Sequence, residues 1–222
     1  MNQLLLRICF GLLLLVTKPT VSAAEMVYIY PLPESKNDHR NDYHWEVLKL
    51  ALKKTSDGYG PYVMKPADAV MTQARQLEEI KNASGKLTVL VSAANREYEQ
   101  VLTPVRIPID KGLIGYRVFL INRKDQPKFA AITTLEELKK LTVGQGADWA
   151  DVAVWKANGF QVMTGGNYDG LFSMVVGGRF DFFSRGMVEV IKEFAQRKEE
   201  MPDLHIEETI CVYYPWPYYF YF

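Results

Sequence analysis

The residues best suited to chemistry in this chain follow an apolar run near its middle. Arg96 comes shortly after the strand-like run Leu87–Val91, with the small residues Ser92–Ala94 between them. A guanidinium at the carboxyl end of a strand can hold a carboxylate or phosphate through two parallel hydrogen bonds. The next segment carries Pro104 and Pro108, and proline favours extended backbone and is excluded from central strands. The pattern predicts an anion-binding arginine beside a crossover between two lobes.

Residue types that would support catalysis or metal binding are not grouped in this sequence. His39, His44 and His205 are scattered, without the short spacings of a metal site. The sequence contains no nucleophile elbow, phosphate-binding loop or dinucleotide fingerprint. The 26 basic and 26 acidic side chains balance, and no basic block marks a nucleic-acid surface. We therefore expect no catalytic residue, no metal, no cofactor and no nucleic-acid partner.

The first residues have the pattern of a secretory signal peptide. The apolar run Ile8–Val16 precedes a polar patch and then Val21 and Ala23, which suit the positions before a cleavage site. That run is too short to span a bilayer comfortably, and no later segment resembles a membrane span. We expect residues 1–24 to be removed on export to the periplasm. Cys211 is then the only remaining cysteine, so no internal disulfide is expected, and we expect its side chain to be buried.

Hydrophobic periodicity predicts alternating strands and helices from residue 26 onward. The expected strands are 26–30, 62–64 and 86–92, and the expected helices between them are 43–54 and 67–80. Such alternation indicates an α/β lobe with a largely parallel sheet.

The alternation resumes after the proline-rich segment. The expected strands are 115–121, 143–146, 162–164, 179–183 and 206–212, and the expected helices are 134–141, 148–158, 167–176 and 188–197. The first of these helices opens with Thr134 and Glu137 at the spacing of a capping box. We predict lobe 1 over residues 25–110, lobe 2 over residues 111–212, and a return crossover toward lobe 1 over residues 213–222.

Three motifs of the second lobe occur in the order seen in a known family. The segment Thr134–Leu141 precedes Val143–Trp149, and Gly177–Asp181 has the form small-Gly-Arg-x-Asp at a strand entry. From about Met26 onward the chain resembles the type-2 periplasmic solute-binding proteins, most closely family 3, the amino-acid-binding branch of ABC transport systems. The resemblance implies two α/β lobes joined by hinge crossovers, with a cleft that closes around a small polar solute.

The resemblance suggests ligand contacts in the first lobe. Arg96 matches the arginine that pairs with the ligand's α-carboxylate in this family, and the hydroxyl of Ser92 lies just upstream. The alternative is a surface arginine paired with Glu97 or Glu99. Tyr30 ends the first strand at the mouth of an open α/β sheet, so it is a candidate ligand contact or a core residue.

In the second lobe the resemblance indicates the turn formed by Gly146, Ala147 and Asp148. Family members offer backbone N–H groups and a hydroxyl there to the same carboxylate, as helix N-termini commonly do for anions. Asp148 departs from that pattern, and its alternative role is to cap the following helix. Trp149, the next residue, either lines the cleft or packs against the helix.

The strongest departure from the family follows Asp181. Arg185 and Gly186 stand where family members present an acid for the ligand's ammonium group. Two arginines facing one cleft would favour a more anionic solute, whereas Glu189, one turn later, could instead neutralise Arg185.

The aromatic segment Tyr213–Phe222 also departs from the family, whose members continue with helices that complete the first lobe. We therefore expect the C-terminal part of the first lobe to be shortened. The sequence predicts a non-catalytic periplasmic protein that binds a small carboxylate-bearing solute, with amino acids among the candidates, for a membrane transporter or sensor. Two alternatives are an enzyme of the same fold using Glu189 or Asp148, and a binding-deficient module that captures a partner through residues 213–222.

Overall fold

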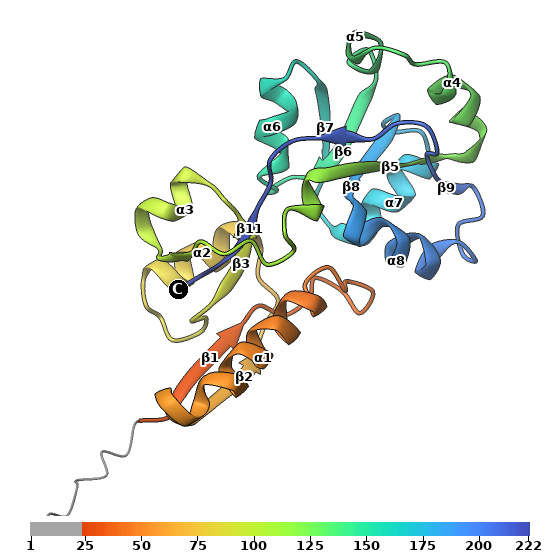
Figure 1. Cartoon of the computed structure of the whole chain (residues 1–222). Helices are drawn as coiled ribbons and strands as arrows, with labels where there is room; N and C mark the ends of the chain where they lie inside the picture. Colours follow the sequence, from red (N-terminus) through yellow and green to blue (C-terminus); the bar gives the residue numbers. More distant parts are fainter. Residues whose placement is uncertain (1–23) are drawn as a thin grey trace, which may run out of the picture.

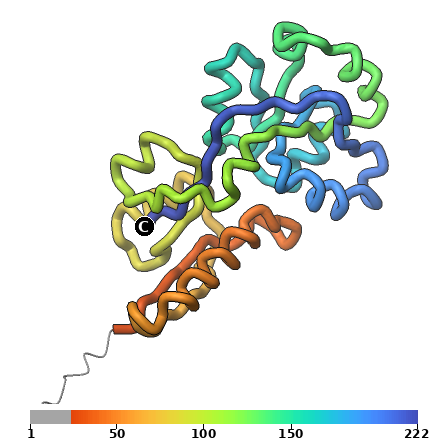
Figure 2. The backbone as a smooth tube through the Cα atoms, viewed as in Figure 1, coloured from red at the N-terminus to blue at the C-terminus, as the bar shows by residue number. Residues whose placement is uncertain are grey.

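Residues 24–222 are described by a computed structural model, so the predicted signal peptide lies outside the described residues apart from Ala24. Two α/β lobes are linked by two segments that run between them (Figure 1, Figure 2). Within residues 24–222, no helix is long and apolar enough to cross a membrane.

Lobe 1 contains a two-stranded and a three-stranded sheet, built from strands of both ends of the described chain. Its strands are β1 (Met26–Tyr30), β2 (Tyr62–Pro66), β3 (Leu90–Ala93), β4 (Pro104–Val105) and β11 (Tyr218–Tyr221). Strands β1 and β2 pair in parallel, and β11 pairs antiparallel with both β3 and β4. Thr88 joins the two groups, because Ile29 N donates to its Oγ1 (2.7 Å) and its own N donates to Ile29 O (2.9 Å).

Three helices pack on the two faces of the strands of lobe 1. They are α1 (Asp42–Tyr59), α2 (Gln73–Lys81) and α3 (Arg96–Val101). Successive residues of a strand point to opposite faces, and β11 follows that rule. Phe220 packs with Leu48 of α1, whereas Tyr221 packs with Leu77 of α2 and Tyr98 of α3. One short strand therefore anchors both layers of lobe 1.

The sheet of lobe 2 has six strands, parallel and antiparallel. Five of them follow one another in the order β10-β5-β8-β6-β7, and β9 also pairs with β5, in antiparallel orientation. The strands are β5 (Tyr116–Asn122), β6 (Thr142–Gly146), β7 (Gln161–Gly165), β8 (Phe182–Gly186), β9 (Leu204–Ile206) and β10 (Val212–Tyr213). The helices are α4 (Gln126–Ala130), α5 (Leu135–Leu138), α6 (Asp151–Ala157), α7 (Tyr168–Val176) and α8 (Met187–Arg197), with 3-10 turns η1 (Leu113–Gly115) and η2 (Arg123–Asp125).

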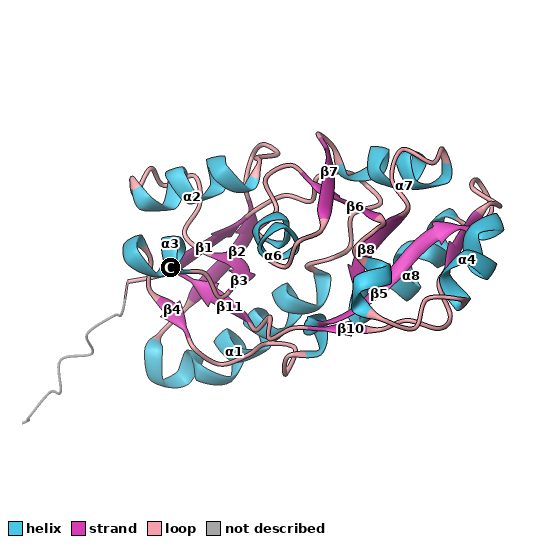
Figure 3. Cartoon of the chain, turned by 90° about the horizontal axis from the view of Figure 1, so that it is seen from above, coloured by secondary structure: helices cyan, strands magenta, loops and turns pink. Residues whose placement is uncertain are grey.

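Alternation along β8 divides the apolar residues of lobe 2 between two clusters. Phe182 joins Trp155 of α6 and Phe129 of α4 on one face. Phe183 joins Phe172 of α7 on the other face, where α8 also packs. The sheet is therefore buried on both sides. Lobe 2 lies beside lobe 1 (Figure 3), and Arg185 at the end of β8 and Trp149 after β6 line the cavity between them.

The two crossing segments are hydrogen-bonded to each other or to the strands beside them. Tyr214 N donates to Gly115 O (3.2 Å), and Ile109 N donates to Tyr218 O (3.1 Å). Trp216 packs with Ala93 of lobe 1 and Ile114 of lobe 2 in an apolar cluster. The paired crossings form a double hinge, and a hinge of this kind permits closure of one lobe on the other.

The predicted α/β class is confirmed, and so is the capping box, in which Thr134 Oγ1 accepts from Glu137 N. Several local predictions were wrong. The strand expected at 179–183 is β8 at Phe182–Gly186, and the helix expected at 67–80 begins at Gln73. The helix expected from residue 148 begins at Asp151, because residues 147–150 form a turn after β6. The strand expected at 206–212 is two strands, β9 and β10, separated by a loop held by Glu207. Cys211 is exposed in that loop rather than buried.

Candidate ligand-binding site

A cavity of about 570 Å³ lies between the lobes. Lobe 1 lines it with the loop after β1, the start of α1 and the end of β3. Lobe 2 lines it with residues of β5, β8 and the turn before α6, and the crossing segment adds Trp216 and Tyr218. A volume of 300–1,000 Å³ is usual for a small-molecule site. The cavity is therefore large enough for a solute of modest size.

Arg40, from the loop between β1 and α1, reaches across this boundary. Its Nε donates to Asp38 Oδ1 (2.7 Å), and its Nη2 donates to Asp38 Oδ2 and Glu34 Oε1 (both 2.7 Å). The guanidinium carbon lies 4.3 Å from the ring centre of Tyr168 and 4.9 Å from that of Trp149, both in lobe 2. Only 12% of the Arg40 side chain is exposed. Arg40 thus connects the two lobes.

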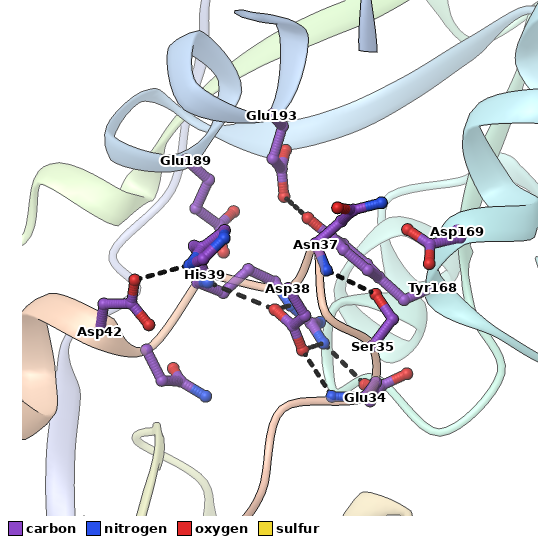
Figure 4. A network of polar contacts seen from close by, with 12 residues as sticks. Glu34, Ser35, Asn37, Asp38, His39, Asp42, Tyr168, Asp169, Glu189 and Glu193 are labelled. Atoms are coloured by element: carbon purple, nitrogen blue, oxygen red, sulfur yellow. Dashed lines mark hydrogen bonds and ion pairs between the residues drawn. The ribbon is translucent and has the colours of Figure 1, made fainter. Parts of the chain in front are cut away.

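The loop that carries Arg40 also determines the protonation of its partner acid. Burial raises the pKa of Asp38, but the hydrogen bonds and charge of Arg40 outweigh burial, so the net pKa lies below its ordinary value. Glu34 N donates to Asp38 Oδ2 (3.0 Å), which fixes the carboxylate. Figure 4 shows Glu34 and Asp38 on this loop beside Tyr168, whose hydroxyl reaches Glu193.

Arg185 of β8 is buried and is held by two acids of α8. Its Nε and Nη2 donate to the two carboxylate oxygens of Glu193 (2.8 and 2.6 Å). Its Nη2 also lies 3.0 Å from Glu189 Oε2, which in turn accepts from Gly186 N (2.9 Å). The alternative that Glu189 neutralises Arg185 is therefore confirmed. Burial lowers the pKa of Arg185, but the two carboxylates outweigh burial and raise it overall.

A third arginine of the cavity, Arg117, was not singled out from the sequence. It is 1% exposed in β5, and its Nη2 donates to Asp151 Oδ2 (3.2 Å). Its Nη1 donates to Ile114 O (3.1 Å) and its Nε to Ser184 Oγ (3.3 Å). Tyr214 OH donates to the other oxygen of Asp151. An arginine inside the apolar run from Tyr116 to Ile121 is the signal that could have indicated a buried ion pair.

The charges around the cavity are predominantly negative. Six acidic side chains and three arginines line it. Each arginine is already paired, and Arg40 and Arg185 each face two carboxylates. Asp42 and Glu46 are paired instead with the lysines Lys192 and Lys49. Around Arg40 and Arg185 the carboxylates therefore outnumber the guanidinium groups, and this negative charge favours a ligand with a positively charged group in the cavity.

The residues predicted as ligand contacts occupy three different places. Tyr30, Ser92 and Arg185 line the interlobe cavity. Tyr30 also packs on Trp45, with ring centres 4.9 Å apart. Gly146, Ala147 and Asp148 line a small adjacent cavity of about 50 Å³, together with Glu34 and Tyr168.

Arg96, the principal sequence-based candidate, is the exposed first residue of α3. Among residues 24–222, it lines neither of these cavities and makes no ion pair within 4.0 Å. Glu99, its proposed surface partner, pairs instead with Arg106 (2.7 Å). Its role as a ligand anchor stays a prediction.

The turn after β6 leaves space for the side chain of Trp149. A Cβ on Gly146 would overlap the Trp149 indole, so glycine is needed there. The indole lines the cavity, as one of the two interpretations of Trp149 expected, and it stacks on Phe183 of β8, with ring centres 6.0 Å apart. Asp148 is exposed and does not cap α6, because that helix begins at Asp151 after Ala150.

This architecture of two α/β lobes, a double crossover and an interlobe cavity is the two-lobed fold of periplasmic binding proteins. An ancestral arginine-binding protein bound to arginine aligns with a TM-score of 0.59 and 16% identity, covering 90% of this chain and 84% of that one. The periplasmic VFT2 domain of Bordetella pertussis BvgS aligns with a TM-score of 0.61 and 15% identity, covering 89% and 80%.

A histidine kinase sensor domain with similarity to periplasmic binding proteins aligns with a TM-score of 0.60 and 14% identity, covering 90% of this chain and 82% of that one. No protein-family model matches the chain, and no curated protein matches it by sequence. At these identities the similarity establishes the fold alone.

Proposed function

We propose that this chain is a non-catalytic solute-binding protein whose lobes enclose a small polar solute in the interlobe cavity. The main support for this proposal is that both lobes and the crossing segment line one cavity of about 570 Å³ with charged and aromatic side chains. The acid considered for catalysis, Glu189, is engaged by Arg185 and by Gly186 N, which supports binding rather than turnover.

The solute we propose carries a positively charged group. The cavity arginines are all paired and the carboxylates are in excess, so an ammonium or guanidinium group would be attracted and an unaccompanied carboxylate repelled. The sequence-based hypothesis adds a carboxylate held by Arg96. An amino acid with a basic side chain would meet both conditions, in keeping with the arginine bound to the structural neighbour.

We also propose export to the periplasm and delivery of the solute to a transporter or a sensor, as a family 3 binding protein would do. The signal-peptide pattern of residues 1–24 supports export. The neighbours include both an arginine-binding protein and a kinase sensor domain, so both kinds of partner are compatible with the fold.

Calorimetric titration of the purified protein tests this function. The panel is arginine, lysine, agmatine, glutamate and succinate, with product analysis of each mixture. We expect saturable binding of the compounds with a positive group and no turnover. Binding restricted to succinate and glutamate would contradict the charge argument, and no binding by the whole panel would refute the function.

The carboxylate hypothesis is tested by Arg96→Ala. If Arg96 holds a carboxylate, arginine binding weakens at least tenfold, or about 1.4 kcal/mol, while agmatine binding is unchanged. Arg106→Ala is the matched control, because Arg106 is an exposed arginine whose partner, Glu99, also lies on α3. Equal affinities for arginine in the wild type and Arg96→Ala would remove Arg96 from the site.

A further inference from the structure

The surroundings of Arg40 have the composition of a binding site for a guanidinium ion. Tyr168 and Trp149 present aromatic rings within 5 Å of the guanidinium carbon, and Asp38 offers both carboxylate oxygens. Cations bind over aromatic faces within about 6 Å of the ring centre, and carboxylates bind guanidinium in a two-point geometry. We call these residues with Glu34 the cation cage.

The walls of the cation cage are held by contacts that do not involve Arg40. Tyr168 OH donates to Glu193 Oε1 (2.7 Å), and Glu193 is itself fixed by Arg185. Trp149 is held between Gly146 and Phe183. The aromatic walls therefore belong to lobe 2 and are held by other residues of lobe 2.

The occupant of the cage, in contrast, comes from the other lobe. Arg40 lies on the lobe 1 loop between β1 and α1, and it carries Asp38 and Glu34 with it. Its insertion joins that loop to the aromatic walls of lobe 2. The side chain therefore occupies the cage as a tethered cation would, and it holds the lobes together.

Arg40 also separates two spaces. A second cavity of about 570 Å³ lies between the start of α1 and α8, and Arg40 and Glu189 line this cavity as well as the first. Leu113, Val188 and Tyr43 give the second cavity an apolar wall. Arg40 is thus one of the residues, with Asp42 and Glu189, that line both cavities.

We propose that the cation cage is a guanidinium-binding site that Arg40 of the same chain fills, and that a free guanidinium compound competes with Arg40 for it. Occupation by Arg40 closes the lobes in the absence of a solute. This inference concerns the cavity of the proposed function, and it rests on that function only for the identity of a natural competitor.

Chemical rescue of Arg40→Ala tests the proposal. Ethylguanidinium replaces the lost end of the side chain, and ethylurea is its neutral planar counterpart. We expect the substitution to lower the melting temperature and to enlarge the radius of gyration measured by X-ray scattering. Millimolar ethylguanidinium should reverse both changes with a saturating dose dependence, as a weak ligand of the native state does, whereas ethylurea should not.

Three further proteins make the rescue specific. The wild type should respond only at far higher ethylguanidinium concentrations than Arg40→Ala, because Arg40 competes for the same cage. Arg106→Ala, which loses an exposed arginine–glutamate pair, should behave as the wild type does. In Arg40→Ala with Asp38→Asn, the rescue should weaken at least tenfold. If Arg40→Ala does not fold, Arg40→Ser, which leaves the same space open, is used in the same way.

The proposal is overturned if ethylguanidinium fails to rescue Arg40→Ala or Arg40→Ser, if ethylurea rescues equally, or if Arg106→Ala responds as strongly. The rescue needs no natural solute. A positive rescue with no binding in the solute panel would therefore support the cage and refute the proposed function, and the reverse result would refute the cage alone.

Discussion

Replacing Glu193 with alanine should destabilise this protein strongly, because it removes the main partner of a buried arginine. Glu193 is 4% exposed and accepts two hydrogen bonds from Arg185, which is 2% exposed, and a third from Tyr168 OH. In Glu193→Ala, the hydroxyl loses its acceptor and the guanidinium keeps only Glu189, at 3.0 Å.

The size of the effect follows from the cost of an unpaired buried charge. Removing one partner of a buried ion pair typically costs about 3–5 kcal/mol. The remaining carboxylate of Glu189 reduces that cost, so we expect roughly 3 kcal/mol at neutral pH. In a chain of this size this corresponds to a fall in melting temperature of roughly 6–12 °C.

Urea unfolding followed by circular dichroism measures the change. Glu136→Ala is the matched control, because Glu136 is 78% exposed and pairs with Lys139 at 2.8 Å. That exposed pair should contribute under about 1 kcal/mol. Both variants remove a glutamate side chain from an ion pair of similar length. The difference between their losses of unfolding free energy therefore reflects the buried surroundings of Glu193.

A double-mutant cycle with Arg185→Met completes the test. If the cost of Glu193→Ala comes from the orphaned guanidinium, adding Arg185→Met should recover at least 1 kcal/mol of it relative to additivity. A loss below about 1 kcal/mol in Glu193→Ala, or strict additivity in the cycle, would refute the reasoning.

Three further perturbations have defined outcomes. Gly146→Ala should cost about 1–3 kcal/mol in urea unfolding because the new Cβ overlaps Trp149, whereas Gly166→Ala, with open space at its Cβ, should change stability by less than about 0.5 kcal/mol; equal effects would contradict the overlap. Burial lowers the pKa of His44 to about 4, so below pH 6.5 the unfolded chain takes up a proton that the native protein does not. Stability should therefore fall by roughly 2–3 kcal/mol between pH 6.5 and 4, and a wild-type curve parallel to that of His44→Gln would exclude this cause. Lys192→Ala removes an exposed pair with the first residue of α1 and should cost under 1 kcal/mol by thermal unfolding, with a larger loss indicating an unrecognised interlobe role.

The α/β class could be predicted because it depends on local patterns. Apolar runs such as Phe119–Ile121 mark strands buried on both faces, and the Thr134–Glu137 spacing marks a helix start. Asn167, at the start of the helix expected over residues 167–176, caps α7 by accepting from Gly170 N (2.7 Å). These features involve residues that are neighbours in sequence.

The centre of the site could not be predicted in the same way. The segment Glu34–Arg40 has the composition of an ordinary polar loop, and nothing in it indicates that Arg40 meets Tyr168, more than 120 residues later. Glu193 was likewise missed, because a glutamate on an amphipathic helix is usually exposed. Such contacts depend on how the lobes meet, and hydrophobic periodicity carries no information about that.

The placement of β11 has a consequence for the order in which the chain can fold. Strand β3 ends at Ala93, but its partner residue Tyr218 lies more than 120 residues later in the chain. At a typical synthesis rate, the ribosome reaches Tyr218 roughly 6–25 s after Ala93. During that time Leu90, Val91 and Ala93 lack the strand that pairs with them, whereas lobe 2 can assemble from the contiguous residues of β5 to β10. A chain that crosses a membrane before folding would benefit from this delay, since β3 and β4 cannot pair until β11 has been made. The same delay leaves an open apolar edge, which makes lobe 1 the part of the nascent chain most in need of a chaperone.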